Sequence, residues 1–242
     1  IAIMLAMDVS SSMLAEDFRP GNRLAAAKRT VRRFVAGRRH DRIGLVAFAG
    51  EALTLVPATL DYGVLAGSIQ GLQVGQLVDG TAIGMGLATA ANRLARAEGR
   101  SKVIVLMSDG ENNRGDIDPR AAARAAAAYG IRIYTVGVGS RGMARVPVAR
   151  TATGLRFRLL PVNVDEPLLR EIATSTGGRY FRATDAEALR RIYAEIDRLE
   201  TTPVRVRRHV AVTEWYLPFL LGGAAVLLGG WFLRATRWGR VP

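Results

Sequence analysis

Five residues with oxygen-bearing side chains could together bind a metal ion. They lie at three separate places in the sequence, each after a short apolar run or at the start of a helical stretch. They are Asp8, Ser10 and Ser12 after the first apolar run, Thr81 before a helical stretch, and Asp109 after a later apolar run. Carboxylate and hydroxyl oxygens are hard ligands, and this set suits an octahedral divalent cation such as Mg²⁺ or Mn²⁺ that keeps several waters. Because hydroxyls are neutral, such a site keeps positive charge and can accept one further carboxylate from outside.

Each of these residues also has an ordinary structural interpretation. Ser10 and Ser12 could form a polar turn after a strand. Thr81 could serve only as the N-cap of its helix, and Asp109 begins a common Asp-Gly turn pair. The metal interpretation is favoured because all five positions fit one ligand set, although they are spread over about a hundred residues.

A parallel sheet is the element that would bring these residues together. Apolar runs alternate with amphipathic helical stretches, which predicts a doubly wound, mostly parallel α/β sheet with its ligand site at the carboxyl ends of the strands. An additional segment at 155–162 is predicted as an excursion on the sheet's edge. Strands are predicted at 2–8, 43–49, 53–56, 103–107, 131–136 and 179–182, and helices at 23–36, 82–98, 119–129, 166–175 and 185–199.

The C-terminal part of the sequence predicts a membrane segment. Residues 215–233 carry no charged side chain, and Trp215, Tyr216 and Trp231 lie near the two ends of the run. At about 1.5 Å per residue, a helix of this length matches the roughly 30 Å hydrocarbon core of a bilayer. The alternative is a buried core helix. The expected organisation is a folded domain over 1–200, a basic juxtamembrane linker over 201–213, a transmembrane helix over 214–233 and a short basic tail over 234–242.

Composition limits the classes of function. The chain has no cysteine, which excludes disulfides and thiolate metal sites, and its two histidines, His40 and His209, argue against a histidine-rich zinc site or a Ser-His-Asp triad. The net charge of +13 favours anionic partners. We interpret the basic block 19–42 as a solvated arginine-rich surface that could contact lipid headgroups. Nucleic-acid binding is not expected, because the block lacks base-reading groups.

The five-residue motif resembles the metal-ion-dependent adhesion site of von Willebrand factor A domains. The residues that match this site are Asp8-x-Ser10-x-Ser12, Thr81 and Asp109. The resemblance implies that Ser10 and Ser12 bind the metal directly and that Thr81 does so in the ligand-competent state. It implies that Asp8 and Asp109 often act through water. It also implies a Mg²⁺ cofactor, with Mn²⁺ or Ca²⁺ as alternatives, and an acidic side chain of a protein partner that completes the coordination shell.

More closely, the chain resembles the Bat-type aerotolerance membrane proteins over residues 1–233. This resemblance implies a location in the bacterial inner membrane, a periplasmic domain and further membrane helices before Ile1. It also implies other Bat-type proteins and a MoxR-type AAA+ ATPase as partners. Ser11 stands where a glycine is common, at a position that is not a ligand. The resembling stretches are 8–18, 41–50, 79–84, 108–113 and 176–183.

Three functions remain open, and a membrane-anchored binding module without catalysis is favoured. A metal-dependent hydrolase would need a base, nucleophile or phosphate cradle beside the metal, and a phosphoaspartyl site would need an aspartate where Ser10 stands. A structural membrane subunit without a working metal site is the third.

The glycine pattern at 137–142 resembles a dinucleotide motif, but Pro147 interrupts the next segment and no helix is expected there. No small-molecule substrate is expected.

Overall fold

The structure is a computed structural model that describes residues 1–18, 21–97, 99, 101–109, 111–140, 142–151, 154–161, 164–200 and 216–235. The chain falls into two compact units, Ile1–Thr202 and Pro203–Pro242.

A six-stranded sheet forms the centre of the first unit and confirms the predicted α/β class. The strand β3 is antiparallel to β2, and all other neighbouring pairs are parallel. All six strands lie where the apolar runs predict them, with small differences at their ends. In spatial order the strands are β3 (Ala52–Thr59), β2 (Arg42–Phe48), β1 (Ala2–Asp8), β4 (Lys102–Ser108), β5 (Ile131–Val138) and β8 (Tyr180–Ala183).

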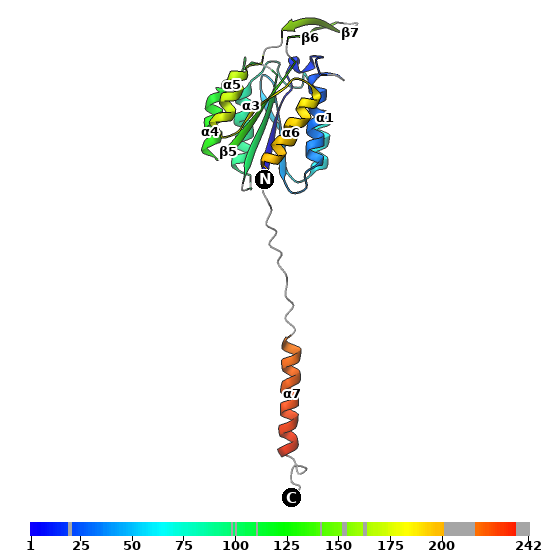
Figure 1. Cartoon of the computed structure of the whole chain (residues 1–242), viewed down its shortest axis with the longest axis vertical. Helices are drawn as coiled ribbons and strands as arrows, with labels where there is room; N and C mark the ends of the chain where they lie inside the picture. The colour runs from blue at the N-terminus through cyan, green and yellow to red at the C-terminus, as the bar shows by residue number, and fades with distance from the viewer. Residues whose placement is uncertain are drawn as a thin grey trace. The chain divides into compact units, whose positions relative to one another are not determined.

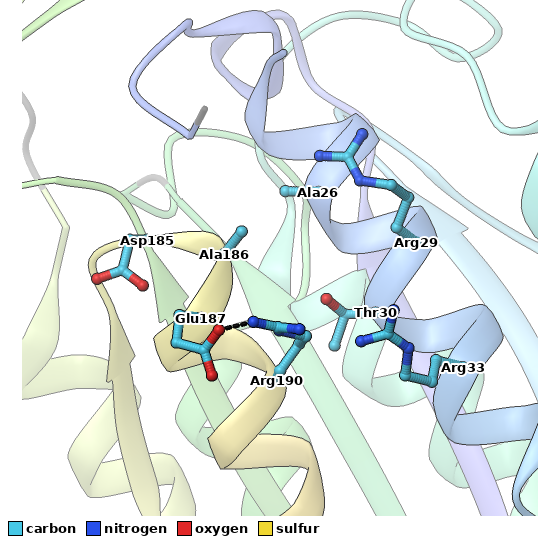
Figure 2. Close-up of a pocket in the computed structure, with 8 residues that line it drawn as sticks. All are labelled: Ala26, Arg29, Thr30, Arg33, Asp185, Ala186, Glu187 and Arg190. Carbon is cyan, nitrogen blue, oxygen red and sulfur yellow. Dashed lines mark ion pairs between the residues drawn. The ribbon is translucent and has the colours of Figure 1, made fainter. Parts of the chain in front are cut away.

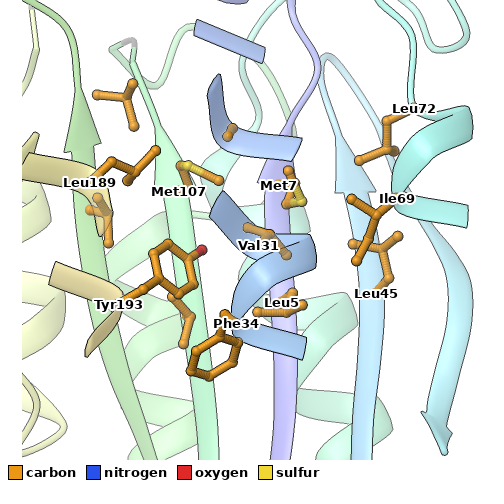
Figure 3. Packing of buried hydrophobic residues seen from close by; sticks show 14 of the residues in the cluster. Leu5, Met7, Val31, Phe34, Leu45, Ile69, Leu72, Met107, Leu189 and Tyr193 are labelled. Atoms are coloured by element: carbon orange, nitrogen blue, oxygen red, sulfur yellow. The ribbon is translucent and has the colours of Figure 1, made fainter. Parts of the chain in front are cut away.

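Helices cover both faces of this sheet (Figure 1), which is why β1 is buried along its whole length. One face packs against α1 (Arg23–Ala36), α2 (Tyr62–Gly71) and α6 (Ala186–Glu200), where Val31, Ile69 and Leu189 meet strand residues such as Leu5 and Leu45 (Figure 3). The other face packs against α3 (Ile83–Ala95), α4 (Pro119–Ala128) and α5 (Glu166–Ser175). A short 3₁₀ helix, η1 (Ser11–Leu14), follows β1.

Capping side chains fix where several helices begin. Asp118 accepts a hydrogen bond from the backbone of Arg120, and Asp165 and Asp185 do the same for Leu168 and Ala188. The helix α2 is absent from the sequence prediction. It contains three glycines and buries only Leu65 and Ile69, so its apolar periodicity is weak.

The strands β6 (Met143–Thr151) and β7 (Gly154–Pro161) form a separate antiparallel hairpin between β5 and α5. The prediction that 155–162 lie at the edge of the main sheet is therefore wrong. The chain leaves the carboxyl edge of the sheet after β5 and pairs with itself beyond that edge, as Figure 1 shows. The dinucleotide pattern at 137–142 leads into this hairpin and not into a helix.

The second unit contains α7 (Tyr216–Ala235), whose apolar side chains such as Phe219, Val226 and Leu227 are exposed. Among the residues that the structure describes, no helix has the length and apolar character needed to cross a bilayer. The structure therefore does not support the transmembrane part of the fold prediction. The predicted linker 201–213, Trp215 and the tail from 236 onward lie outside the described residues.

Candidate metal centre

The predicted site lies at the carboxyl edge of the sheet, where β1 and β4 end side by side. These two strands are parallel neighbours in a register that pairs Met7 with Met107. Asp8 is the last residue of β1 and Ser108 the last of β4, and the Ser108 hydroxyl donates a hydrogen bond of 2.6 Å to Asp8 Oδ2. Asp109, which follows Ser108, therefore lies at the same edge of the sheet.

Hydrogen bonds connect four of the five predicted residues. Asp8 Oδ1 accepts a bond of 2.9 Å from the backbone N–H of Ser10. The hydroxyl oxygens of Ser10 and Ser12 are 3.0 Å apart, and the Ser12 hydroxyl donates to Asp109 Oδ1 at 2.7 Å. Four oxygen-bearing side chains are thus gathered in one small volume, as the sequence predicts.

Thr81, the fifth residue, is buried and is fixed through its backbone to the loop that follows β4. Its N–H donates to Asn113 Oδ1 at 2.9 Å, and its carbonyl oxygen accepts from the N–H groups of Asn113 and Arg114. The preceding turn is tied to η1, because the N–H of Ser11 donates to Asp79 Oδ1 at 3.0 Å. These bonds place Thr81 in the same group of loops as the other four residues.

The alternative role of Thr81 as a side-chain cap of α3 is not supported. The capping position is Ala82, and no side chain there closes the helix. The N–H of Ile83 is bound instead by Asn112 Oδ1 at 2.9 Å, from the loop after β4. Sequence reasoning missed Asn112 and Asn113 as groups that hold this turn, since their partners are about thirty residues away.

A buried arginine that the sequence analysis missed lies beside the site. Arg23 is 3% exposed; its Nη1 donates to Asp109 Oδ2 at 2.7 Å. Its Nε and Nη2 donate to both carboxylate oxygens of Asp17 at 2.8 and 2.6 Å. The interpretation of the block 19–42 as a solvated surface is therefore wrong for Arg23. One signal existed: a basic residue in the first turn of a helix is unfavourable unless something compensates it.

Burial and neighbouring charges shift the pKa values of the three carboxyl groups at the site. Burial, together with the negative charge of Asp109, raises the pKa of Asp8 to about 7. Burial also raises the pKa of Asp109, although Arg23 and Ser12 oppose that effect. Burial acts the same way on Asp17, but hydrogen bonds from Arg23 and Ser140 outweigh it, so the pKa of Asp17 is lowered.

The donors at this edge fit a hard divalent cation. Within the described part of the chain, no group of three or more His, Cys, Asp or Glu side chains is placed to hold a metal ion. The donors here are of a different kind, because two buried carboxylates are combined with serine and threonine hydroxyls. A cation at this edge would offset both the burial of the Asp8 carboxylate and the repulsion by Asp109, the two causes of its raised pKa.

A separate cavity of about 400 Å³ lies between α1 and α6. None of the five predicted residues lines it. Its charged side chains partly neutralise one another, as in the ion pair between Arg190 and Glu187 (Figure 2). The candidate metal centre therefore stands on the strand-end residues and not on this cavity.

Comparison with known proteins agrees with the fold. A model of the von Willebrand factor type A domain matches residues 2–195. An uncharacterized protein of Borreliella burgdorferi is 28% identical over 93% of this chain and 66% of its own length. A UPF0353 protein of Mycolicibacterium paratuberculosis is 33% identical over 94% of this chain and 67% of its own length. The chain thus spans about two thirds of the length of these relatives.

Solved structures give the same result. BatB from Bacteroides thetaiotaomicron superimposes with a TM-score of 0.70 at 33% identity, covering 82% of this chain and 98% of that one. An aerotolerance-related membrane protein from Bacteroides fragilis gives 0.68 at 31% identity, covering 81% and 97%. Proximal thread matrix protein 1 of the mussel byssus, described with zinc in its adhesion-site motif, shares the fold at 21% identity and a TM-score of 0.59, covering 81% and 46%.

Proposed function

The chain belongs to the von Willebrand factor type A domain family, and from this premise we propose that it is a binding protein. Its metal centre would hold a divalent cation, for which Mg²⁺ is the first candidate. A carboxylate of a partner protein would complete the coordination shell. The observation that supports this most directly is the hydrogen-bonded series Ser10, Ser12 and Asp109 beside the buried Asp8.

The roles that we propose for the five residues are those that the resemblance to the adhesion site implies. Ser10, Ser12 and Thr81 would hold the cation through their hydroxyls, and Asp8 and Asp109 would hold it through water. When bound, the cation supplies positive charge that an incoming carboxylate can approach. Asp109 accepts a bond from the Ser12 hydroxyl and thereby orients its oxygen, while Arg23 holds Asp109 in place.

Binding without catalysis is the proposed activity. Both carboxylates are buried, and each is already engaged: Asp8 by Ser108 and the backbone of Ser10, Asp109 by Ser12 and Arg23. These contacts suit carboxylates that hold other ligands in place, which is the role that a binding site requires of them. Metal-dependent hydrolysis and a purely structural subunit are the two competing functions.

We also propose that the protein works at a bacterial membrane. The similar protein from Bacteroides fragilis is described as a membrane protein, and α7 exposes a series of apolar side chains. In this proposal residues 1–200 form the binding domain on the periplasmic side of the inner membrane and residues 214–233 attach it. The linker 201–213 and the tail 234–242 flank that segment. Other Bat-type proteins and a MoxR-type AAA+ ATPase are the proposed partners.

Carbonate-resistant membrane association that is lost when residues 216–235 are removed would support the attachment, and unchanged association would contradict it.

Calorimetric titration of Mg²⁺ and Mn²⁺ into the whole chain tests the metal centre. Saturable binding to one site, lost in Asp8→Ala and in Ser10→Ala/Ser12→Ala, is the expected result. The titration is repeated with millimolar acetate, because a weak site can need a carboxylate ligand. No binding under either condition would favour the structural subunit, and chelator-sensitive phosphatase or ATPase activity of the pure protein would favour the hydrolase.

A further inference from the structure

The hairpin of β6 and β7 is the feature that the metal centre leaves unexplained. It lies beyond the carboxyl edge of the sheet, the edge at which the metal centre is built (Figure 1). Its sequence from Met143 to Pro161 contains four arginines and no acidic residue: Arg145, Arg150, Arg156 and Arg158. Such a concentration of positive charge on a short segment attracts partners of opposite charge.

The base of the hairpin is bound to the segment that carries the metal ligands. The N–H of Glu16 donates to the carbonyl oxygen of Arg145 at 3.0 Å, and their side chains form an ion pair at 3.2 Å. The N–H of Ser140 donates to Asp17 Oδ2 at 2.9 Å, and Asp17 is the carboxylate that binds Arg23. The hairpin is therefore positioned by the residues that follow η1.

Two exposed arginines, Arg156 and Arg158, lie on one face of the hairpin. Alternate residues of a strand share a face, so Arg156, Arg158 and Leu160 lie together, and opposite residues of an antiparallel pair share a face as well. Leu160 is opposite Ala144, which is 2% exposed, so this end of the face is buried at the base of the hairpin. Arg156 and Arg158 are exposed, and within the described residues neither forms an ion pair.

We propose that the hairpin and the metal centre together form one docking surface for an acidic segment of a partner protein. This inference rests on the proposed function: one carboxylate of the segment occupies the metal centre, and neighbouring carboxylates pair with Arg156 and Arg158. Guanidinium groups suit this task because they bind carboxylates through two parallel hydrogen bonds. The metal centre supplies affinity for any carboxylate, and the hairpin selects segments that carry several.

Fluorescence anisotropy on the whole chain with Mg²⁺ tests the inference with two labelled peptides. One carries a single aspartate, and the other carries the same aspartate flanked by glutamates. The wild type is expected to prefer the acidic peptide by about tenfold at low salt. Arg156→Glu/Arg158→Glu is expected to abolish that preference and to leave Mg²⁺-dependent binding of the single-aspartate peptide unchanged. Arg32→Glu/Arg33→Glu on the exposed side of α1 makes the same charge change away from the hairpin and should keep the preference.

The outcomes separate this inference from the function on which it rests. Equal preference in wild type and Arg156→Glu/Arg158→Glu overturns the role of the hairpin and leaves the metal centre standing. Binding of the acidic peptide that persists in chelator and in Asp8→Ala overturns both, because the hairpin would then act without the metal. Binding of anionic phospholipid vesicles that depends on Arg156 and Arg158, with no preference between the peptides, overturns the protein partner in favour of a lipid surface.

Discussion

Arg23 Nη1 lies 2.7 Å from Asp109 Oδ2, and both side chains are buried. A helix residue and a strand-end residue that are 86 positions apart in the sequence thus form an ion pair inside the domain. Asp17, bound to the same guanidinium, makes the arrangement a triad with one positive and two negative groups. The triad connects the candidate metal centre to the base of the β6–β7 hairpin, because Asp17 also accepts from Ser140.

Replacing Arg23 by Met is expected to destabilise the protein strongly. The change leaves Asp17 and Asp109 without their guanidinium partner, and breaking a buried pair from one side typically costs about 3–5 kcal/mol. Urea denaturation measures the loss in the free energy of unfolding. Arg33→Met, on the exposed side of the same helix, should stay within about 0.5 kcal/mol of wild type. Equal stability of the two variants would show that the Arg23 pair is not formed.

Replacing Asp8 by Asn is expected to change how stability depends on pH in the presence of a chelator. The folded-state pKa of Asp8 is raised to about 7, while an unfolded aspartate titrates near about 3.9. The folded state therefore binds more protons between these values, and the contribution of Asp8 to stability falls as pH rises from about 4 to about 7. Asn cannot ionise, so the stability of Asp8→Asn relative to wild type should increase from pH 5 to pH 8.

Thermal denaturation across that pH range measures the difference. The exposed Asp116→Asn is the control and should follow the wild type at each pH. A stability difference between Asp8→Asn and wild type that does not change with pH would contradict the raised pKa of Asp8.

Replacing Asn112 by Ala is expected to destabilise the start of α3. The Asn112 side chain binds the N–H of Ile83, which takes the place of a local cap, and removal of a capping side chain costs about 1 kcal/mol. Hydrogen exchange of the first turn of α3 should be faster in the variant. Asn92→Ala, at an exposed position of the same helix, provides the matched control. If exchange in that turn is unchanged, the contact does not cap the helix.

Replacing Gly84 by Ala is expected to disturb the packing of α3 against the loop before α4. A Cβ at this position would meet the backbone carbonyl of Ile117, which cannot move as a flexible side chain would. Such overpacking costs about 1–3 kcal/mol. Gly67→Ala in α2 has open space around its Cβ and should instead stabilise by about 0.5–1 kcal/mol through helix propensity. Chemical denaturation of the pair tests the sign of each effect, and a stabilised Gly84→Ala would refute this packing.

Local and periodic features of the fold could be predicted from the sequence. The bounds of β1 and α1 follow from a continuous apolar run and from a helical apolar face, and Asp118-Pro119 marks the start of α4. The five candidate ligands could be chosen because each lies next to the end of a strand or the start of a helix. Parallel strands then bring those points to one edge.

Features that depend on distant partners could not be predicted in this way. Arg23 looks like any other arginine of a basic helix until Asp109 and Asp17 are placed beside it. Asn112 and Asn113 resemble a solvated loop until the turn at Thr81 meets them. The hairpin was misplaced for a related reason, because an antiparallel ladder gives the same local pattern wherever it lies.

The place at which the β6–β7 hairpin enters the fold has a consequence for how such a domain can diversify. In the described part of the chain its two strands form backbone hydrogen bonds with each other and not with the six-stranded sheet. The hairpin is inserted in the chain between β5 and α5. A hairpin inserted in this way can change in length or sequence while the strand register beneath it stays the same. The surface beyond the sheet can therefore change while the strand-end residues of the candidate metal centre stay in place.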